Sequence, residues 1–275
     1  MHPIFFTLFG FDVHFYSIFF TLGLAAGCLI FVFGDRRLRK DFREPLLDAY
    51  LYILIAIMIG AKLLYVFINM KSYIGHLDLM WSDFRRGFLF YGGLIGAVFA
   101  MILFFRKKDL PVWYFVDAAA PAIPLGHAIG RIGCLFAGCC YGSPTDLPWG
   151  IIYPASCPIA PSGVPLHPYP IYEMIGNLII FAVIMSIRYK SKVPGRMMAV
   201  YLMGYGLLRF GLEYTRGDFV QTIGVFSEQQ VISLVLFAVG LVGFFLLAKM
   251  KHRDLAEYPL PIRPQEIAKK PKRSI

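Results

Sequence analysis

The chain alternates between long apolar segments and short polar ones along most of its 275 residues. A window of about 19 residues, the length with which a helix spans a bilayer, detects seven apolar segments. They cover residues 13–33, 46–69, 87–105, 112–135, 171–187, 197–214 and 229–248. This pattern predicts an all-α polytopic membrane protein with seven transmembrane helices. The fourth is the most irregular, because Pro121 and Pro124 can kink or break it.

Composition agrees with a membrane protein and excludes other classes. Hydrophobic residues make up 58% of the chain and charged residues only 16%, which argues against a soluble enzyme. The net charge of +10 lies in short clusters between apolar segments, so no basic patch for nucleic acid is expected. We therefore predict a single transmembrane domain over residues 1–250, including a long outer loop at 136–170, and a basic cytoplasmic tail at 251–275.

The basic residues of the loops predict the orientation. One set of alternate loops, together with the tail, holds 20 Lys and Arg, and the opposite set holds 4. Because the basic side of a membrane protein faces the cytoplasm, the amino terminus is expected outside and the carboxyl terminus inside. The proline-rich loop at 136–170 carries no basic residue and lies on the outer side in this topology.

Three basic residues, Lys62, Arg131 and Arg209, fall inside predicted spans. A charge at the bilayer centre costs roughly 2.5 to 3.5 kcal/mol on translocon scales, so such residues usually face the bundle interior and mark a site. Structural ion pairing or snorkelling is the alternative for each one alone. Tyr16, Tyr91 and the pair Tyr172 and Glu173 also fall in the outer halves of their spans, which predicts a cationic cavity open toward the outer leaflet.

The sixth span carries Tyr205, Arg209, Glu213 and Arg216 at spacings of 4, 4 and 3, which would place all four on one helix face. One carboxylate between two guanidiniums leaves a net positive charge, and such a fork suits a phosphate. The fourth span carries a similar set, His127, Arg131 and Cys134, at spacings of 4 and 3. His127 alone is more typical of a hydrogen-bonded packing histidine.

Glycines cluster at 91–96 (YGGLIG) and at 130–142 (GRIGCLFAGCCYG). Small residues let transmembrane helices approach closely, so Gly92, Gly93 and Gly96 can be explained by packing alone. No G-K-S or G-K-T follows either stretch, which excludes a nucleotide-binding loop.

With these residues the chain resembles the prolipoprotein diacylglyceryl transferase family over nearly its whole length. The family pattern H-G-G-L-I-G is similar to residues 91–96, and G-R-x-G-N-F-x-N-G-E-x-x-G is similar to residues 130–142. The stretch 166–173 and the residues from 204 through Arg209, Glu213 and Arg216 also resemble it in order and spacing. Tyr16 corresponds to a tyrosine early in the first helix, and Lys62 stands where the family often has Arg.

The resemblance implies a transferase of the bacterial cytoplasmic (inner) membrane. It moves the diacylglyceryl group of phosphatidylglycerol to the lipobox cysteine thiol in the signal peptide of a prolipoprotein and releases glycerol 1-phosphate. No cofactor and no metal is implied. It suggests Arg131, Arg209 and Tyr91 as catalytic residues, and it suggests a further set for substrate binding: Tyr16, Lys62, Gly92, Gly93, Gly142, His167, Tyr205, Glu213 and Arg216.

The chain departs from the family pattern at several positions. Tyr91 replaces the His that heads the first motif, and the second motif has Cys134 and Ala137 for Asn and Cys139 for Glu. A phenol with an ordinary pKa near 10 is a poor base at neutral pH. The thiol base is therefore an activated Tyr91, His167 or Glu173, unless the positive field of the arginines lowers the pKa of the substrate thiol itself.

Cysteines suggest the main alternative functions. Cys134, Cys139, Cys140 and Cys157 all fall on the outer side, as a membrane thiol oxidoreductase would require. None forms a C-x-x-C pair, so neither a redox pair nor a zinc site is indicated by spacing, and a packing set or one stabilising disulfide is the plainer interpretation. A family paralogue with altered lipid specificity, or one that only binds lipid, is the other alternative.

Overall fold

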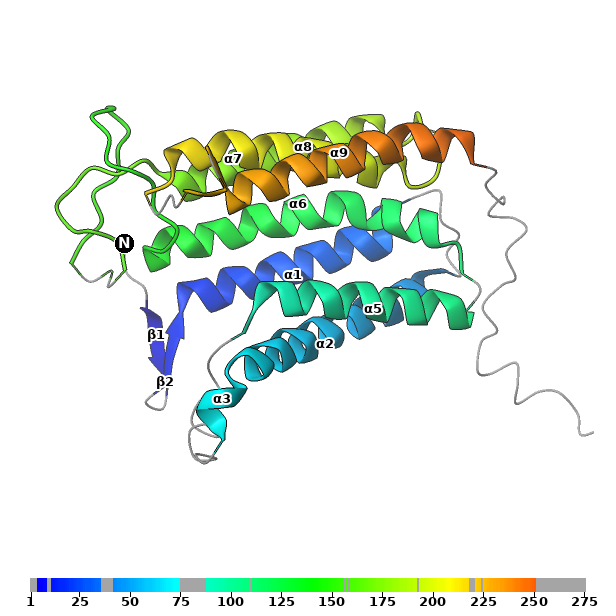
Figure 1. Cartoon of the computed structure of the whole chain (residues 1–275), viewed down its shortest axis with the longest axis horizontal. Helices are drawn as coiled ribbons and strands as arrows, with labels where there is room; N and C mark the ends of the chain where they lie inside the picture. The colour runs from blue at the N-terminus through cyan, green and yellow to red at the C-terminus, as the bar shows by residue number, and fades with distance from the viewer. Residues whose placement is uncertain are drawn as a thin grey trace, which may run out of the picture. The chain divides into compact units, whose positions relative to one another are not determined.

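A computed structural model describes residues 4–8, 11–35, 42–74, 88–108, 110–155, 157, 159–191, 193–217, 221–223 and 225–250. The described chain is mostly helical (Figure 1). Its long helices are α1 (Phe15–Phe33), α2 (Arg43–Ile68), α5 (Phe90–Lys108), α6 (Val112–Ala137), α7 (Tyr169–Ile187), α8 (Arg196–Leu212) and α9 (Glu228–Lys249). A short helix, α3 (Met70–Tyr73), follows α2.

Each of the seven apolar segments predicted from the sequence coincides with one long helix. The fourth segment is not broken at its prolines, because α6 continues through both Pro121 and Pro124. Both prolines are buried. Proline is tolerated inside such helices where neighbouring groups compensate for the backbone hydrogen bonds that it removes.

The prediction of an all-α fold is incomplete, because two small hairpins are present. Strand β1 (Ile4–Leu8) pairs antiparallel with β2 (Phe11–His14), and β3 (Gln221–Ile223) pairs antiparallel with β4 (Phe226–Ser227). Both hairpins directly precede a helix, α1 and α9 respectively. Strands this short carry too few residues for alternation of polar and apolar positions to reveal them.

The helices form two compact units. One, which we call unit 1, comprises residues 1–37 and 113–252 and contains α1, α6, α7, α8 and α9. The other, unit 2, lies within residues 38–112 and contains α2, α3 and α5. The predicted basic tail at 251–275 lies outside the described residues.

Four of the described helices, α1, α2, α7 and α9, are long and apolar enough to cross a membrane. Helix α5 contains a shorter apolar stretch, Tyr91–Arg106. Helices α6 and α8, which carry Arg131 and Arg209, are not among them. The chain is thus a membrane protein with several apolar spans.

Small residues bring the helices of unit 1 close together. A Cβ atom added at Gly23 of α1 would lie 2.6 Å from the carbonyl oxygen of Gly126 in α6. Where α9 packs along α8, a Cβ atom at Gly240 would lie 2.8 Å from the carbonyl oxygen of Ala199 (Figure 1). Backbones approach this closely only where side chains are absent, as is common between helices in lipid.

The connection between α6 and α7 is folded back on itself. Leu166 and Ile151 exchange backbone hydrogen bonds of 2.9 and 3.0 Å, and Tyr153, Cys157, Ala160 and Leu166 form a small buried core. Burial raises the pKa of Tyr153 to about 12. The connection that the sequence predicted as a long loop at 136–170 therefore forms a packed cap at one end of unit 1 (Figure 1).

Candidate functional site

An ion pair between α6 and α7 forms the first part of the site. Nη2 of Arg131 lies 2.8 Å from Oε2 of Glu173, whose side chain is fully buried. Nε of Arg131 donates to Nε2 of His127, one turn earlier on α6, at 3.1 Å. The guanidinium is therefore held in one orientation by groups on two helices, as a group prepared for a planar anion would be.

Glu173 also faces α8. Its Oε1 atom lies 3.4 Å from Nε2 of His127 and accepts a long hydrogen bond of 3.5 Å from the Tyr205 hydroxyl. Both carboxylate oxygens are thus directed at the side chains that surround Arg131. His127 is therefore hydrogen-bonded within this network.

A second ion pair lies at the end of α8. Nη1 of Arg209 is 2.8 Å from Oε2 of Glu213, and it also donates to the hydroxyl of Tyr169 on α7. Ser227 donates to Oε1 of Glu213 at 2.9 Å, and the same Ser227 caps α9 by accepting from the Gln230 amide. The first turn of α9 therefore fixes the carboxylate that orients Arg209.

Arg216 completes a group of three arginines, although not in the predicted way. Helix α8 ends at Leu212, Glu213 lies in a 3₁₀ turn (η3, Glu213–Thr215), and Arg216 is extended with φ −79° and ψ 141°. The prediction that all four residues share one helix face is therefore wrong for Arg216. Its guanidinium nevertheless returns to the site, since its Cζ atom lies 5.5 Å from the centre of the Tyr169 ring.

Tyr169 and Glu173, four residues apart on α7, connect the two ion pairs. The Cζ atoms of Arg209 and Arg216 lie 5.7 and 5.5 Å from the Tyr169 ring, while Glu173 holds Arg131. Three guanidiniums and two carboxylates leave one net positive charge in this largely buried place. We refer to Arg131, Arg209, Arg216, Glu173 and Glu213 together as the arginine cluster.

His167 and Gly142 lie in the cap over α6 and α7. Nδ1 of His167 is 3.2 Å from the hydroxyl of Tyr172, which also accepts from the Trp149 indole at 2.7 Å. The Gly142 amide donates to the His167 carbonyl, and Gly142 pairs with Arg216 in a β-bridge. A Cβ atom at Gly142 would lie 2.4 Å from that of His167, so this glycine is required for packing.

Tyr16, near the start of α1, has a half-exposed side chain, and its backbone packs against Gly133 of α6. Lys62, Tyr91, Gly92 and Gly93 belong to unit 2. There Nζ of Lys62 lies 5.2 and 5.3 Å from the rings of Tyr65 and Phe88. The structure thus brings together the predicted residues of unit 1, while those on α2 and α5 form a separate set.

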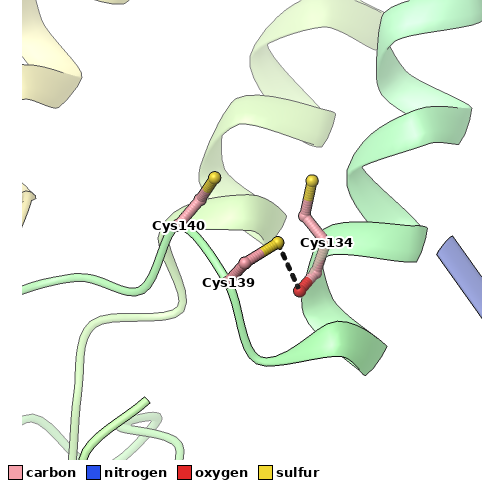
Figure 2. Close-up of side chains that lie close together, drawn as sticks. All are labelled: Cys134, Cys139 and Cys140. Atoms are coloured by element: carbon pink, nitrogen blue, oxygen red, sulfur yellow. Dashed lines mark hydrogen bonds between the residues drawn. The ribbon is translucent and has the colours of Figure 1, made fainter. Parts of the chain in front are cut away.

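Three cysteines meet at the end of α6. The sulfur atoms of Cys134, Cys139 and Cys140 all lie within 4.8 Å of one another (Figure 2). We call these three the cysteine group. Cysteine spacing indicated no metal site and allowed one stabilising disulfide, but all five cysteines of the chain are free thiols and three of them converge.

Arg131 joins the cysteine group to the arginine cluster, because its Nη1 atom lies 3.8 Å from Sγ of Cys134. Hydrogen bonding to the Cys134 thiol, and then to the Cys139 thiol, lowers the pKa of Cys140. The charges of Arg131 and Arg216 act in the same direction on Cys140. The same end of unit 1 therefore offers both an anion-binding group and soft sulfur ligands.

Sequence reasoning missed two residues that hold the cluster together. Tyr169 lies inside the stretch 166–173 but was not singled out, because an aromatic ring gives no sign that its hydroxyl binds an arginine. Ser227 reads as an ordinary helix cap for α9, and its second bond to Glu213 depends on tertiary structure. Only the capping signal, a Ser three residues before a Gln, was visible in the sequence.

Comparison with known proteins identifies the family. The family described as prolipoprotein diacylglyceryl transferase matches residues 3–246. Relatives named phosphatidylglycerol–prolipoprotein diacylglyceryl transferase include that of Clostridium tetani, 33% identical over 89% of this chain and 97% of the relative. Others come from Bordetella avium, 33% identical over 88% and 93%, and Geobacter sulfurreducens, 30% identical over 90% and 96%. The chain therefore belongs to the prolipoprotein diacylglyceryl transferase family.

Proposed function

We propose that this protein transfers the diacylglyceryl group of phosphatidylglycerol to the lipobox cysteine thiol of a prolipoprotein and releases glycerol 1-phosphate. The family match over residues 3–246 carries this proposal. The arginine cluster supports it independently, because a buried group with one net positive charge suits a phosphodiester that carries one negative charge.

The reaction needs a fixed cation where negative charge grows. As the thiolate sulfur bonds to the terminal glycerol carbon of the lipid, the bond from that carbon to the phosphate oxygen breaks, and the phosphate gains a negative charge. Arg131 and Arg209 are our candidates for binding this phosphate, since each is already oriented by a carboxylate. A preorganised donor of this kind typically contributes about 10²- to 10³-fold in kcat.

The neighbouring residues fit supporting roles. Tyr205 and Tyr16 would contact the headgroup, Glu213 orients Arg209, and Arg216 adds positive charge next to Tyr169. Gly142 and His167 shape the cap above the site. Lys62, Tyr91, Gly92 and Gly93 remain proposed substrate contacts on unit 2.

The sequence left the thiol base open, and the geometry of unit 1 bears on two of the candidates. Glu173 is engaged with Arg131, and Nδ1 of His167 is engaged with Tyr172. Glu173 would have to exchange a partner before it could accept a proton from a substrate, whereas the contact at Nδ1 of His167 does not engage the second ring nitrogen, Nε2. We therefore favour activation of the thiol by positive charge near Arg131, or proton transfer to Nε2 of His167, over Glu173 as the base.

The proposed topology has seven transmembrane helices in the bacterial cytoplasmic membrane, with the amino terminus outside and the carboxyl terminus in the cytoplasm. The cap at 138–168 has no basic residue and lies at the same end of unit 1 as the start of α7 (Figure 1). By the positive-inside rule this end faces outward, so the arginine cluster would meet lipid from the outer leaflet and the signal peptide of a translocated precursor.

A detergent assay tests the proposed function. Purified protein is mixed with phosphatidylglycerol and a lipobox peptide, and the gain in peptide mass is followed together with release of glycerol phosphate. Both products are expected in equal amounts. Binding of the lipid without either product would indicate the lipid-binding paralogue, and oxidation of the peptide thiol instead of its alkylation would indicate the oxidoreductase.

Two variants connect the activity to the cluster. Arg131→Ala and Arg209→Ala should each reduce transfer at least about 100-fold, because each removes a donor from the developing phosphate charge. Arg106→Ala is the matched control, since Arg106 is exposed at the end of α5. Equal activity of all three variants would contradict the proposed roles.

A further inference from the structure

The cysteine group is produced by the turn that ends α6. Gly138 has φ +66° and Cys140 has φ +57°, so two left-handed residues reverse the chain immediately after the helix. The Cys139 amide donates to the Cys134 carbonyl at 3.2 Å, and the Cys139 thiol points to the same oxygen. Positive φ is unusual for a residue other than glycine, and here it directs a third sulfur toward the other two (Figure 2).

Three sulfurs at this separation suit a soft metal ion. In a tetrahedral site each sulfur lies about 2.3 Å from zinc, so the sulfurs are about 3.8 Å apart. The observed separations, up to 4.8 Å, require a contraction of about 1 Å. Rotation of the Cys139 and Cys140 side chains can supply it, because both are partly exposed and lie in the connection after the helix.

The positive charge of Arg131 favours the negative charge that a zinc complex of three thiolates carries. Three thiolates and one Zn²⁺ carry one net negative charge, and Nη1 of Arg131 lies 3.8 Å from Sγ of Cys134. Three protein ligands also leave one of four zinc positions open, as in catalytic rather than structural zinc sites. The partial exposure of Cys139 and Cys140 allows a fourth ligand to reach that position.

The geometry points to a Zn²⁺ site formed by Cys134, Cys139 and Cys140 whose open position binds the thiol of the incoming lipobox cysteine. This inference rests on the proposed function and adds a further means of activating the thiol to the positive charge of Arg131 and to His167. A thiol that coordinates zinc is deprotonated at neutral pH, and the thiolate is the reactive nucleophile.

The step balances without any oxidant or reductant. The substrate thiol loses its proton to water as sulfur binds zinc. The sulfur lone pair then forms a bond to the carbon of the diacylated glycerol that carries the phosphate oxygen. The electrons of the breaking carbon–oxygen bond pass to that oxygen and leave with the glycerol phosphate. Arg131, next to both the sulfur ligands and Glu173, is placed to receive that phosphate.

Metal content gives the first test. The full-length protein, purified in detergent with a tag that contains no histidine run, should hold about one zinc per chain. The triple variant Cys134→Ser, Cys139→Ser and Cys140→Ser should hold none, whereas Cys28→Ser is the matched control and should keep it. Cys28 lies on α1, outside the cysteine group.

Cobalt substitution tests the open position directly. Protein loaded with Co²⁺ should show sulfur-to-metal charge-transfer absorption, and a lipobox peptide should change the visible bands of the ion. A peptide with Ser in place of Cys should not change them. These spectra do not depend on whether any lipid is transferred, so they report on the metal site alone.

The outcomes separate this inference from the proposed function. Loss of transfer on chelation, with recovery on adding Zn²⁺, supports both. Full transfer by metal-free protein and by the triple variant would overturn the zinc inference and leave the transferase intact. A peptide-responsive cobalt spectrum without any transfer of lipid would support the thiol-binding metal site and overturn the proposed function. Titration of two fewer thiols than the sequence holds, with no metal bound, would indicate a disulfide and overturn the site.

Discussion

Nη2 of Arg131 lies 2.8 Å from Oε2 of Glu173, and this ion pair joins α6 to α7 inside unit 1. The Glu173 side chain is fully buried, while that of Arg131 keeps 17% of its surface exposed. An unpaired charge at such a place is costly, so removing either member of the pair leaves the other without its compensating charge. The exposed part of Arg131 is the part that an anionic substrate can reach.

Glu173→Gln should therefore destabilise the protein and impair catalysis together. It leaves the Arg131 guanidinium without its charged partner, and breaking a buried pair in this way typically costs about 3 to 5 kcal/mol. Thermal unfolding in detergent and initial rates at a permissive temperature measure the two effects. Glu228→Gln, which changes an exposed carboxylate at the start of α9, is the control. Wild-type stability in Glu173→Gln would mean that the ion pair is not formed.

The hydroxyl groups of two tyrosines in the site make hydrogen bonds of different strength. A matched pair of Tyr→Phe variants measures how much each hydrogen bond contributes to catalysis. The Tyr169 hydroxyl accepts a hydrogen bond from Arg209, whereas the Tyr205 hydroxyl is 3.5 Å from Glu173. Tyr169→Phe should lower kcat by about 10- to 150-fold, because a hydrogen bond to a charged group contributes about 1.5 to 3 kcal/mol. Tyr205→Phe should change kcat less than Tyr169→Phe does. The reverse order would place the phosphate nearer to Tyr205.

Much of the fold could be predicted from the sequence, because transmembrane helices depend on local composition. The bilayer requires about 20 apolar residues for each span, and that requirement is visible without any tertiary information. The continuation of α6 through Pro121 and Pro124 was not predictable in the same way. It depends on neighbouring helices that a sequence pattern does not reveal.

The candidate site shows the same division between local and tertiary information. Arg131 and Arg209 stood out because charges are rare in apolar segments. Helical spacing explained Arg209 with Glu213, but it misplaced Arg216, since the helix ends before that residue. The cysteine group was missed because Cys134 is brought near Cys139 and Cys140 by a left-handed turn rather than by a recognised spacing.

Asp117, a buried carboxylate of α6, binds the start of α8, a helix far from it in the sequence. Its Oδ1 atom accepts hydrogen bonds from the amides of Met197 and Met198, at 2.8 and 3.4 Å, in the first turn of α8. A carboxylate here satisfies amides that have no partner within the helix and complements the helix dipole. Asp117→Ala should cost about 1 to 3 kcal/mol of stability, because a buried amide and a partly buried one lose their acceptor.

Asp117→Asn keeps an oxygen acceptor and should lose less stability than Asp117→Ala. Neither variant should change kcat at a temperature where the protein is folded, since Asp117 is not part of the arginine cluster. Unfolding curves and initial rates distinguish the two effects. A large loss of kcat in a well-folded Asp117→Asn variant would show that this carboxylate participates in the reaction.

Gly92 and Gly93 were both predicted to contact substrate, yet they differ in how closely α2 approaches them. A Cβ atom at Gly92 would lie 2.4 Å from the Gly60 carbonyl oxygen, a backbone atom that cannot move without shifting the helix. At Gly93 the nearest atom is a side-chain methyl of Ile57 at 3.1 Å, which can move by a few tenths of an ångström. Gly92→Ala should therefore destabilise the packing of α2 on α5 by more than about 1 kcal/mol, as overpacking does.

Gly93→Ala is the matched control, because it adds the same methyl group one residue away. If these glycines serve packing, Gly92→Ala should lower the unfolding temperature and Gly93→Ala should change it little, with KM for phosphatidylglycerol unchanged in both folded variants. If they contact the lipid, KM should rise in Gly93→Ala while its unfolding temperature stays at the wild-type value. The unfolding temperature and KM, measured for both variants, separate helix packing from substrate binding. Only helix packing depends on the distance between Gly92 and the Gly60 backbone.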